Sequence, residues 1–341
     1  MANKHMGKQT VALQNPPCIA AGAAVVGKKE GEGPLRERFD YISSDTYFGQ
    51  KTWEKAESSM FKQCFSLVCD KAKMAPGELD YLLSGDLLNQ CVGSTFGLRD
   101  SQVPFFGLYG ACSTMAESLS LGAMLLDGGF ARQLCCMTGS HFCSAERQFR
   151  APLEYGGQRT PTAQWTVTGA GALILKNSGS GPHVTHVTTG RIVDAGIVDG
   201  NNMGAAMAPA AYDTLKAHFE DTGRDPSYYD AVLTGDLGAF GHKILEDFFR
   251  GDGVCFDKVF TDCGMLIFNV SHQDTHCGGS GCGCAASVLC GHILKLMQEG
   301  TWNRVLFAAT GALMSPTTAQ QGESIPGICH AVAIENMQEV S

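Results

Sequence analysis

Apolar runs alternate with amphipathic stretches along most of this chain. Hydrophobic positions recur at helical spacing over residues 53–72, 114–126, 209–219 and 285–298. Short apolar runs typical of buried strands lie between them, and two of these, near residues 167–175 and 329–335, are expected to complete two sheets. Because strands that alternate with helices are joined by crossovers, the pattern predicts an α/β fold with largely parallel sheets.

Two segments of the chain recur in the same order. The sequence DYLLSGDL at 80–87 matches DAVLTGDL at 230–237, and the segment 127–139 matches 299–311. Each member of the first pair predicts a buried strand that ends in Gly-Asp. Two ordered matches indicate duplication of one α/β unit. We therefore predict two βαβ-rich halves, residues 10–195 and 196–341, in one tight pseudo-dimer whose connection spans about 194–210.

The composition narrows the classes of function. The 341 residues are 44% hydrophobic and 17% charged, which suits a globular protein with a large core. The net charge of −9 argues against a nucleic-acid partner, because such binding depends on Lys and Arg. Fifteen cysteines occur without a CxxC pair, so neither a zinc site nor another metal or cofactor is expected. No apolar run is long enough to predict a membrane span.

Cys112 lies where an apolar strand is expected to meet a helix that starts near Ser113. Backbone N–H groups and the helix dipole at such a junction favour a thiolate, so we expect a lowered pKa and a nucleophilic sulfur. The alternative is a small buried apolar side chain, which is the usual role of a free cysteine.

A glycine-rich run over residues 276–284 precedes another predicted helix. After the duplication its end corresponds to Cys112, so both helix starts are expected to face one cleft. The amides of Gly278, Gly279 and Ser280 could then form an anion nest or an oxyanion hole, or the glycines could serve close packing. His276, beside the run, is the best candidate among the histidines for a general base.

Polar residues at the ends of the two repeated strands are further candidates. Asp86 and Asn89 follow the first strand, and Asp236 follows the second. Ligands bind at the carboxyl edges of doubly wound sheets, which favours a role in a site. An aspartate after glycine is also a common helix or turn cap, and both interpretations stay open.

The duplicated halves and the cysteine elbow at 110–114 resemble the thiolase and ketoacyl synthase superfamily. Within it, segments 84–90, 145–150, 154–157, 203–211, 278–282 and 323–326 are similar to the stage V sporulation protein AD family, over about residues 7–335. The resemblance implies a thiolase-like, layered α/β/α/β/α pseudo-dimer. It further implies a homodimer, in which a short strand at 133–137 would suit a sheet edge that continues across a twofold axis.

The sequence departs from the catalytic members of this superfamily at two places. Gly235-Asp236 stands where condensing enzymes of the ketoacyl synthase type carry a catalytic histidine, and the Gly-His-Pro of thiolases is replaced by His276-Cys-Gly-Gly-Ser. A nucleophile without an assured base is weak evidence for turnover.

The family resemblance implies a binding protein for dipicolinic acid, which sporulation machinery moves into or out of the spore as its calcium chelate. It implies a peripheral place on the spore inner membrane beside other SpoVA membrane proteins, with the cytoplasm as the alternative. Asn89, Ser113 and His276, the helix starts after Cys112 and Cys284, and the amides of 278–280 would hold the ligand. Asp86 and Asp236 would either face away as caps or help to hold calcium.

A cysteine-dependent acyltransferase is the alternative function. In that case Cys112 would attack an acyl thioester, with His276 as the base. Covalent acylation of Cys112 distinguishes this enzyme from a binding protein.

Overall fold

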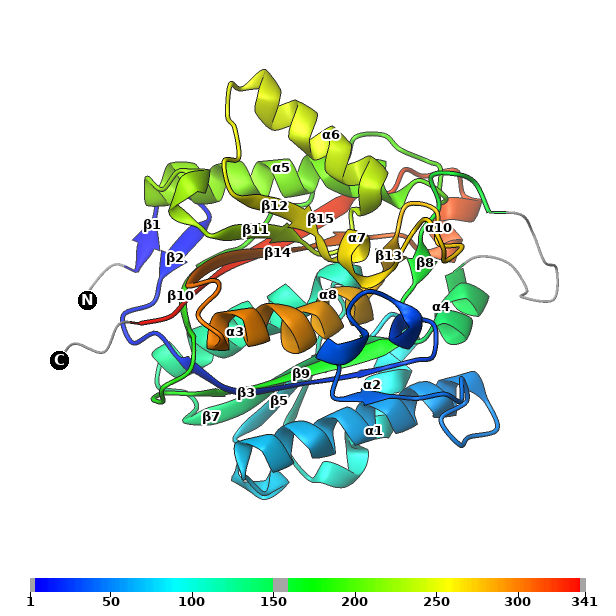
Figure 1. Ribbon diagram of the computed structural model, residues 1–341, viewed down its shortest axis with the longest axis vertical. Coiled ribbons are helices and arrows are strands. Elements are labelled where there is room, and N and C mark those ends of the chain that lie inside the picture. Colours follow the sequence, from blue (N-terminus) through cyan, green and yellow to red (C-terminus); the bar gives the residue numbers. More distant parts are fainter. Residues whose placement is uncertain (1–3, 150–158, 338–341) are drawn as a thin grey trace.

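Two sheets enclose a central layer of helices, and further helices cover both outer faces (Figure 1). The computed structural model describes residues 4–149 and 159–337. The helices are α1 Trp53–Ala72, α2 Val92–Leu98, α3 Thr114–Asp127, α4 Phe142–Phe149, α5 Met203–Thr222, α6 Gly238–Gly251, α7 Cys263–Ile267, α8 Cys282–Val288, α9 Leu294–Gln298 and α10 Pro316–Gln320. Within the described residues, none of them is both long and apolar enough to cross a membrane.

The strands are β1 His5–Met6, β2 Thr10–Ala12, β3 Cys18–Val26, β4 Tyr41–Ile42, β5 Tyr81–Gly85, β6 Phe105–Gly107, β7 Gln133–Ser140, β8 Trp165–Thr166, β9 Gly169–Lys176, β10 His183–Thr188, β11 Ala231–Thr234, β12 Val259–Asp262, β13 Gly279–Ser280, β14 Arg304–Ala312 and β15 Gly327–Glu335. The main path runs β12-β11-β14-β15-β10-β3-β9-β7-β5-β6, and β8 pairs separately with β13. Strands β10 and β3 are joined by the single residue pair His183 and Cys18. The strand order turns at this point, so that the strands on either side form two separate layers.

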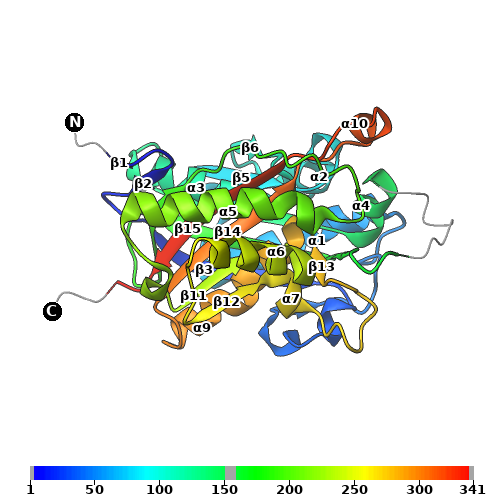
Figure 2. The ribbon, with the colours of Figure 1, turned by 90° about the horizontal axis from the view of Figure 1, so that it is seen from above.

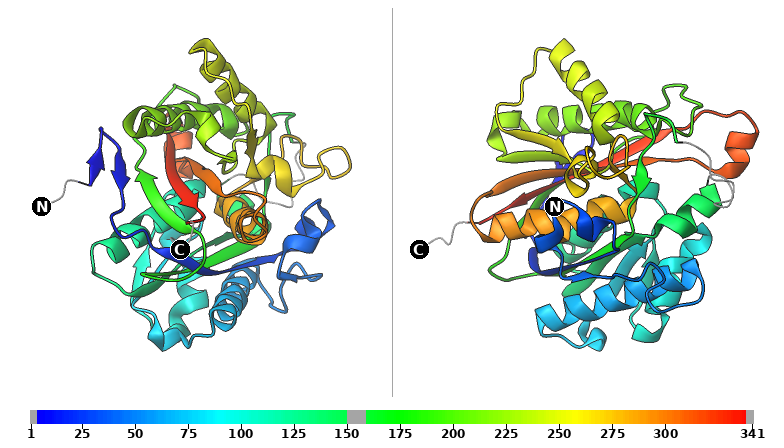
Figure 3. Two further views of the ribbon diagram at one scale, coloured as in Figure 1. Left: turned by 60° about the vertical axis from the view of Figure 1, so that its left-hand side comes forward. Right: turned by 45° about the vertical axis from the view of Figure 1, so that its right-hand side comes forward.

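The layers follow the predicted α/β/α/β/α order. Helices α5 and α6 cover the β11–β14–β15 sheet, as the view from above in Figure 2 shows. Helices α3, α8 and α9 lie between the sheets, and α1 covers the β3–β9–β7 sheet on the far side (Figure 3). Separate apolar clusters fill these spaces, with Leu119 and Leu289 in the centre, Phe61 under α1 and Leu215 under α5. Burial of both sheet faces explains why the strand sequences are nearly continuous apolar runs.

The strand order is symmetric about the neighbours β10 and β3. Strands β15, β14, β11 and β12 follow on one side, and β9, β7, β5 and β6 follow on the other. In both arms an antiparallel pairing, β14–β15 or β7–β9, precedes two parallel pairings. Asp86 directly follows β5, and Asp236 lies two residues after the end of β11, so the two Gly-Asp motifs lie at the ends of corresponding strands. The order is that expected of a duplicated unit, and the boundary at residues 195 and 196 stays a prediction.

Two expectations about individual elements are wrong. The connection was predicted to extend to residue 210, but it ends at Asn202 because α5 begins at Met203. The Asn202 side chain caps this helix by accepting the Ala205 amide, and Pro209 lies inside the helix. Strand β7, expected to form a sheet edge, lies between β5 and β9, and the edge is β6. In each case tertiary contacts outweigh a local sequence signal. Buried small residues pack α5 against β15 in spite of Pro209, and β9 pairs with β7 on the side that was expected to be an edge.

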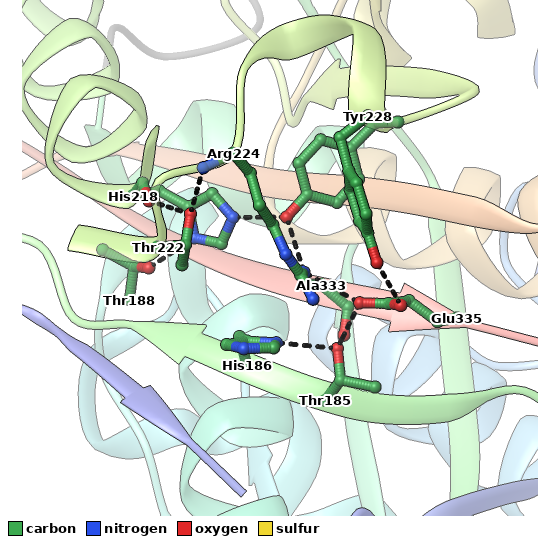
Figure 4. Close-up of polar contacts among 10 residues, drawn as sticks. Thr185, His186, Thr188, His218, Thr222, Arg224, Tyr228, Ala333 and Glu335 are labelled. Atoms are coloured by element: carbon green, nitrogen blue, oxygen red, sulfur yellow. Dashed lines mark hydrogen bonds and ion pairs between the residues drawn. The ribbon is translucent and has the colours of Figure 1, made fainter. Parts of the chain in front are cut away.

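A buried polar network fixes the far end of the second half (Figure 4). Arg224 donates hydrogen bonds to Glu335 at 2.8 Å and to the Tyr229 hydroxyl at 3.1 Å, and the Tyr228 hydroxyl donates to Glu335 at 3.0 Å. His218 Nε2 lies 2.5 Å from the Tyr229 hydroxyl, and burial lowers the pKa of His218 to about 3. The network ties the chain just after α5 to the end of β15.

Candidate functional site

A cavity of about 550 Å³ lies where the two halves meet at the carboxyl ends of β5 and β14. Its walls come from the turn after β5, the elbow before α3, helix α4, strand β8, the start of α5, strand β13 and the segment after β14. The lining residues are Leu87, Asn89, Tyr109, Ala111, Cys112, Ala145, Glu146, Gln148, Phe149, Thr166, Met203, Ser280 and Ala312, Leu313, Met314, Ser315, Pro316 and Thr317.

The structure brings together only some of the predicted site residues. Asn89, Cys112 and Ser280 line the cavity. The other predicted residues lie behind its wall or away from it: Asp86, Ser113, Asp236, His276, Gly278 and Gly279. Sequence position therefore identified one lining residue in each of three walls: the turn after β5, the elbow before α3 and β13.

The elbow that presents Cys112 is a short, tight turn. Ala111 has a φ of +52°, and residues Ala111–Ser113 form one 3-10 turn before α3 begins. Ser113 does not face a ligand, because its hydroxyl and its amide both donate to the Gly110 carbonyl, at 2.7 and 3.2 Å. A Cβ on Gly311 of β14 would lie 2.7 Å from that same carbonyl oxygen. The second half thus packs directly against the elbow of the first.

The Cys112 thiol is perturbed in the direction opposite to that predicted. Burial raises the pKa of Cys112 well above its ordinary value, and the neighbouring Asp236 carboxyl and Cys282 thiol raise it further. The side chain packs in an apolar cluster with Leu87, Ala145 and Cys282. Desolvation therefore outweighs the helix dipole, and the resting side chain is a neutral thiol.

Asp236 is the charged neighbour with the largest effect on the pKa of Cys112. Its buried carboxyl also accepts the Gly281 amide at 2.8 Å, the Thr310 hydroxyl at 2.9 Å and the Ser280 hydroxyl at 3.3 Å. Burial is the largest effect on this group and, against these hydrogen bonds, raises its pKa to about 7. Transfer of the thiol proton to Asp236 is uphill because the thiol is the weaker acid. This pair is consequently a poor nucleophile and base.

Asp86 is a cap, in line with the structural alternative. One oxygen accepts the Leu88 amide at 2.9 Å, and the other accepts the amide and the hydroxyl of Ser94, both at 2.7 Å. These donors hold the turn after β5 to α2. Across the described ranges, no group of three or more His, Cys, Asp or Glu side chains could hold a metal ion.

The glycine run is closely packed, and the Gly278 amide of the predicted anion nest is already hydrogen-bonded within the protein. The Gly278 amide donates to the Thr275 carbonyl at 3.0 Å, and the Gly278 carbonyl accepts the Trp165 amide at 2.9 Å. Gly279 lies in β13, where a Cβ would lie 2.7 Å from Ile267. The helix also starts earlier than predicted, at Cys282, and continues through a π-helical segment to α9. Between the two helix starts the Cys112 and Cys282 side chains pack together.

His276 is not placed to act as a base for Cys112. It has a φ of +50°, and its Nε2 atom lies 3.2 Å from a carboxylate oxygen of Asp274 in the loop before β13. Among the described residues that line the cavity there is no histidine, lysine or arginine, and Glu146 is the single carboxylate.

Sequence reasoning missed two parts of the site, helix α4 and the segment 312–317. Gln148 of α4 accepts the Asn89 amide at 3.0 Å and donates to the Leu87 carbonyl at 3.2 Å, and Thr166 donates to Glu146 at 3.0 Å. The available signal was the 145–150 segment, which carried the family resemblance without an assigned role. Residues 150 and 154–157 of the quoted segments lie outside the described residues.

Comparison with known proteins supports the fold and the family. The structure is similar to 3-oxoacyl-(acyl-carrier-protein) synthase III from Aquifex aeolicus VF5, over 94% of this chain and 99% of that one, with a TM-score of 0.57 and 14% identity. A variant of OleA from Xanthomonas campestris is similar over 98% of this chain and 99% of its own, with a TM-score of 0.61 and 15% identity.

Sequence comparison is more specific. Stage V sporulation protein AD from Bacillus subtilis strain 168 is 43% identical over 332 residues, which cover 97% of this chain and 98% of that protein. The sequence profile of the same family, stage V sporulation protein AD (SpoVAD), matches residues 7–335. The chain is therefore a member of the stage V sporulation protein AD family, built on the thiolase-like fold.

Proposed function

We propose that the protein binds dipicolinic acid in the cavity that ends at Cys112, and so takes part in moving this compound into or out of the spore. The observation that carries the proposal is a formed cavity without an activated nucleophile. Its volume, about 550 Å³, lies within the range usual for small-molecule sites. The Cys112 thiol at its inner end is neutral and faces a carboxyl group instead of an imidazole.

The charges around the cavity favour the calcium chelate over the free dianion. Asp236 lies directly behind the wall, and no cation lines the cavity within the described residues. Two carboxylates of a free ligand would find no lining cation, and any charge on Asp236 would repel them. A one-to-one calcium chelate is neutral, so calcium would enter as part of the cargo. Tyr109, Asn89 and Gln148 would supply neutral donors to its outer oxygens.

Calorimetric titration with dipicolinate, with and without equimolar calcium, tests this proposal. We expect one site per chain and tighter binding with calcium. Ala312→Phe places a ring in the cavity wall and should abolish binding, whereas Ala319→Phe on the exposed face of α10 should not. Equal affinity in both variants would place the ligand elsewhere, and the absence of binding to the unmodified protein would refute the function.

An acyltransferase is the second candidate, and the cysteine at the inner end of the cavity favours it. A related fold supports the choice of probe, since OleA from Xanthomonas campestris has been crystallised with lauric acid and lauroyl-CoA. Intact mass measured after incubation with lauroyl-CoA separates the two functions. A binding protein gains no acyl mass, and its Cys112→Ala variant keeps its affinity for dipicolinate. Acylation that disappears in Cys112→Ala would instead establish the enzyme.

We propose that the protein reaches the spore inner membrane through a protein partner, with other SpoVA membrane proteins as candidates. The net charge of −9 disfavours direct adhesion to anionic lipid. Flotation with acidic liposomes should leave the purified protein in the unbound fraction. Strong, salt-sensitive association with those liposomes would contradict this route.

A further inference from the structure

Helix α4, one wall of the cavity, rests on a buried carboxyl group of α1. Ala145, Glu146 and Phe149 line the main cavity, and Ser144 and Arg147 line a smaller cavity of about 270 Å³ between α1 and α4. Beside that smaller cavity the Ser144 hydroxyl oxygen lies 2.5 Å from Oε2 of Glu57. Both side chains are almost fully buried. This contact therefore sets the distance between α1 and the cavity wall.

The contacts of Ser144 suit either protonation state of Glu57. The Ser144 oxygen also lies 3.0 Å from the His141 carbonyl oxygen, which accepts the Ala145 amide at 3.1 Å. A serine hydroxyl can both donate and accept. It can therefore donate to an ionised Glu57, or accept from a protonated Oε2–H while its own proton points to His141.

A second buried carboxyl shows which of the two acids carries the proton. Burial raises the pKa of Asp86, but Asp86 accepts two backbone amides and the Ser94 hydroxyl, and these donors favour its ionised form over that of Glu57. Glu57 has no such set: its Oε1 packs against the Cα side of Gly93 and has no hydrogen-bond partner among the described residues. Burial, followed by the Asp86 charge, raises the pKa of Glu57 well above its ordinary value.

The remaining groups around Glu57 do not neutralise it. Glu54, one turn earlier on α1, adds negative charge, and its own ion pair is with Arg147 of α4. The Cys282 thiol of α8 feels the charges of both buried acids and is itself neutral, because its pKa is raised well above the ordinary value. No cation therefore contacts Glu57 within the described residues, and ionisation would place two uncompensated carboxylates side by side.

We propose that Glu57 is a positioning residue for the ligand cavity: in its neutral form it donates to Ser144 and holds α4 in place. Ionisation would leave the Ser144 hydroxyl as a donor, but it would put an unpaired charge on the buried Oε1, add repulsion against Asp86 and loosen the packing of α1 against the wall. The consequence for the ligand rests on the proposed function, because it assumes that dipicolinate occupies this cavity. Affinity should then fall as pH rises through the pKa of Glu57.

Amide hydrogen exchange of α4 tests, without any ligand, whether Glu57 holds this helix in place. Glu57→Gln keeps a donor of the same shape, so residues 142–149 should exchange as in the unmodified protein. Glu57→Ala and Ser144→Ala each remove one partner, so exchange should be about tenfold faster or more. Glu54→Gln, which alters an exposed α4 contact, is the matched control and should change exchange little. Similar rates in Glu57→Gln and Glu57→Ala would overturn the proposal.

Infrared difference spectra locate the proton directly. At pH 7 the unmodified protein minus Glu57→Gln should show the carbonyl band of a protonated carboxylic acid. Its absence would refute the neutral form even if the variants fold normally.

Calorimetry with calcium dipicolinate between pH 6 and pH 9 then measures the coupling. Glu57→Gln should bind with an affinity that changes less with pH than that of the unmodified protein. Identical pH profiles for the two proteins would refute the coupling. If neither protein binds dipicolinate but the exchange and infrared results are as expected, the proposed function is refuted and the role of Glu57 in positioning α4 is supported.

Discussion

Replacement of Asp236 by asparagine should make the protein's stability less dependent on pH. The folded-state pKa of Asp236 is about 7, against about 4 for an unfolded aspartate. Below pH 4 the carboxyl is neutral in both states. Between pH 4 and pH 7 only the unfolded chain releases the proton, so the free energy of unfolding falls as pH rises. At about 1.4 kcal/mol for each pKa unit, this penalty reaches roughly 4 kcal/mol by pH 8.

Urea unfolding followed by circular dichroism from pH 4 to pH 8 measures this effect as a difference between the two proteins. Asp236→Asn lacks the titrating group, so its stability relative to the unmodified protein should rise by about 4 kcal/mol across that range. Other buried acids, such as Glu30, are present in both proteins and cancel. Asp247→Asn, an exposed change in the same half, should show no such rise. A difference that varies by less than about 1 kcal/mol would refute the reasoning.

The same substitution should also change Cys112. Removing the negative neighbour lowers the pKa of the thiol, because the Asp236 charge and hydrogen bond both favour the protonated form. The rate of iodoacetamide alkylation at Cys112, measured by peptide mass spectrometry, should rise at pH 8 in Asp236→Asn. The half-exposed Cys277 provides an internal control in every sample. An unchanged alkylation rate would show that access of the reagent limits the reactivity of Cys112, and that ionisation of the thiol does not.

Three further outcomes follow from other parts of the structure. Gly241→Val should lower the melting temperature by several degrees, because a Cβ there would lie 2.7 Å from Gly204 of α5, and Gly251→Ala in open space should not. Phe106→Asp on the exposed edge strand β6 should convert the expected homodimer to a monomer in light scattering, whereas an unchanged mass would place any dimer contact elsewhere. His218→Gln should reduce the loss of stability between pH 6 and pH 4, because the pKa of His218 is near 3 when folded and about 6.5 when unfolded; equal losses would exclude this histidine.

The sequence by itself determined the architecture. Helix α1 begins and ends at the predicted residues, and α3 differs by one. The repeated Gly-Asp motifs end corresponding strands, and Cys112 lies at an elbow before a helix. These features depend on local periodicity and on repetition along the chain. Local sequence therefore contains the information that specifies them.

Only the tertiary structure decided the chemistry of the site. The pKa of Cys112 depends on burial and on Asp236, which lies more than a hundred residues away in the chain. The cavity wall includes α4 and the segment 312–317, which meet only after both halves have folded. The amides of Gly278 and Gly281 in the glycine run donate to Thr275 and Asp236, partners that no local pattern identifies. Desolvation and hydrogen-bond competition arise from the whole surrounding shell, so they are set by packing and not by spacing along the sequence.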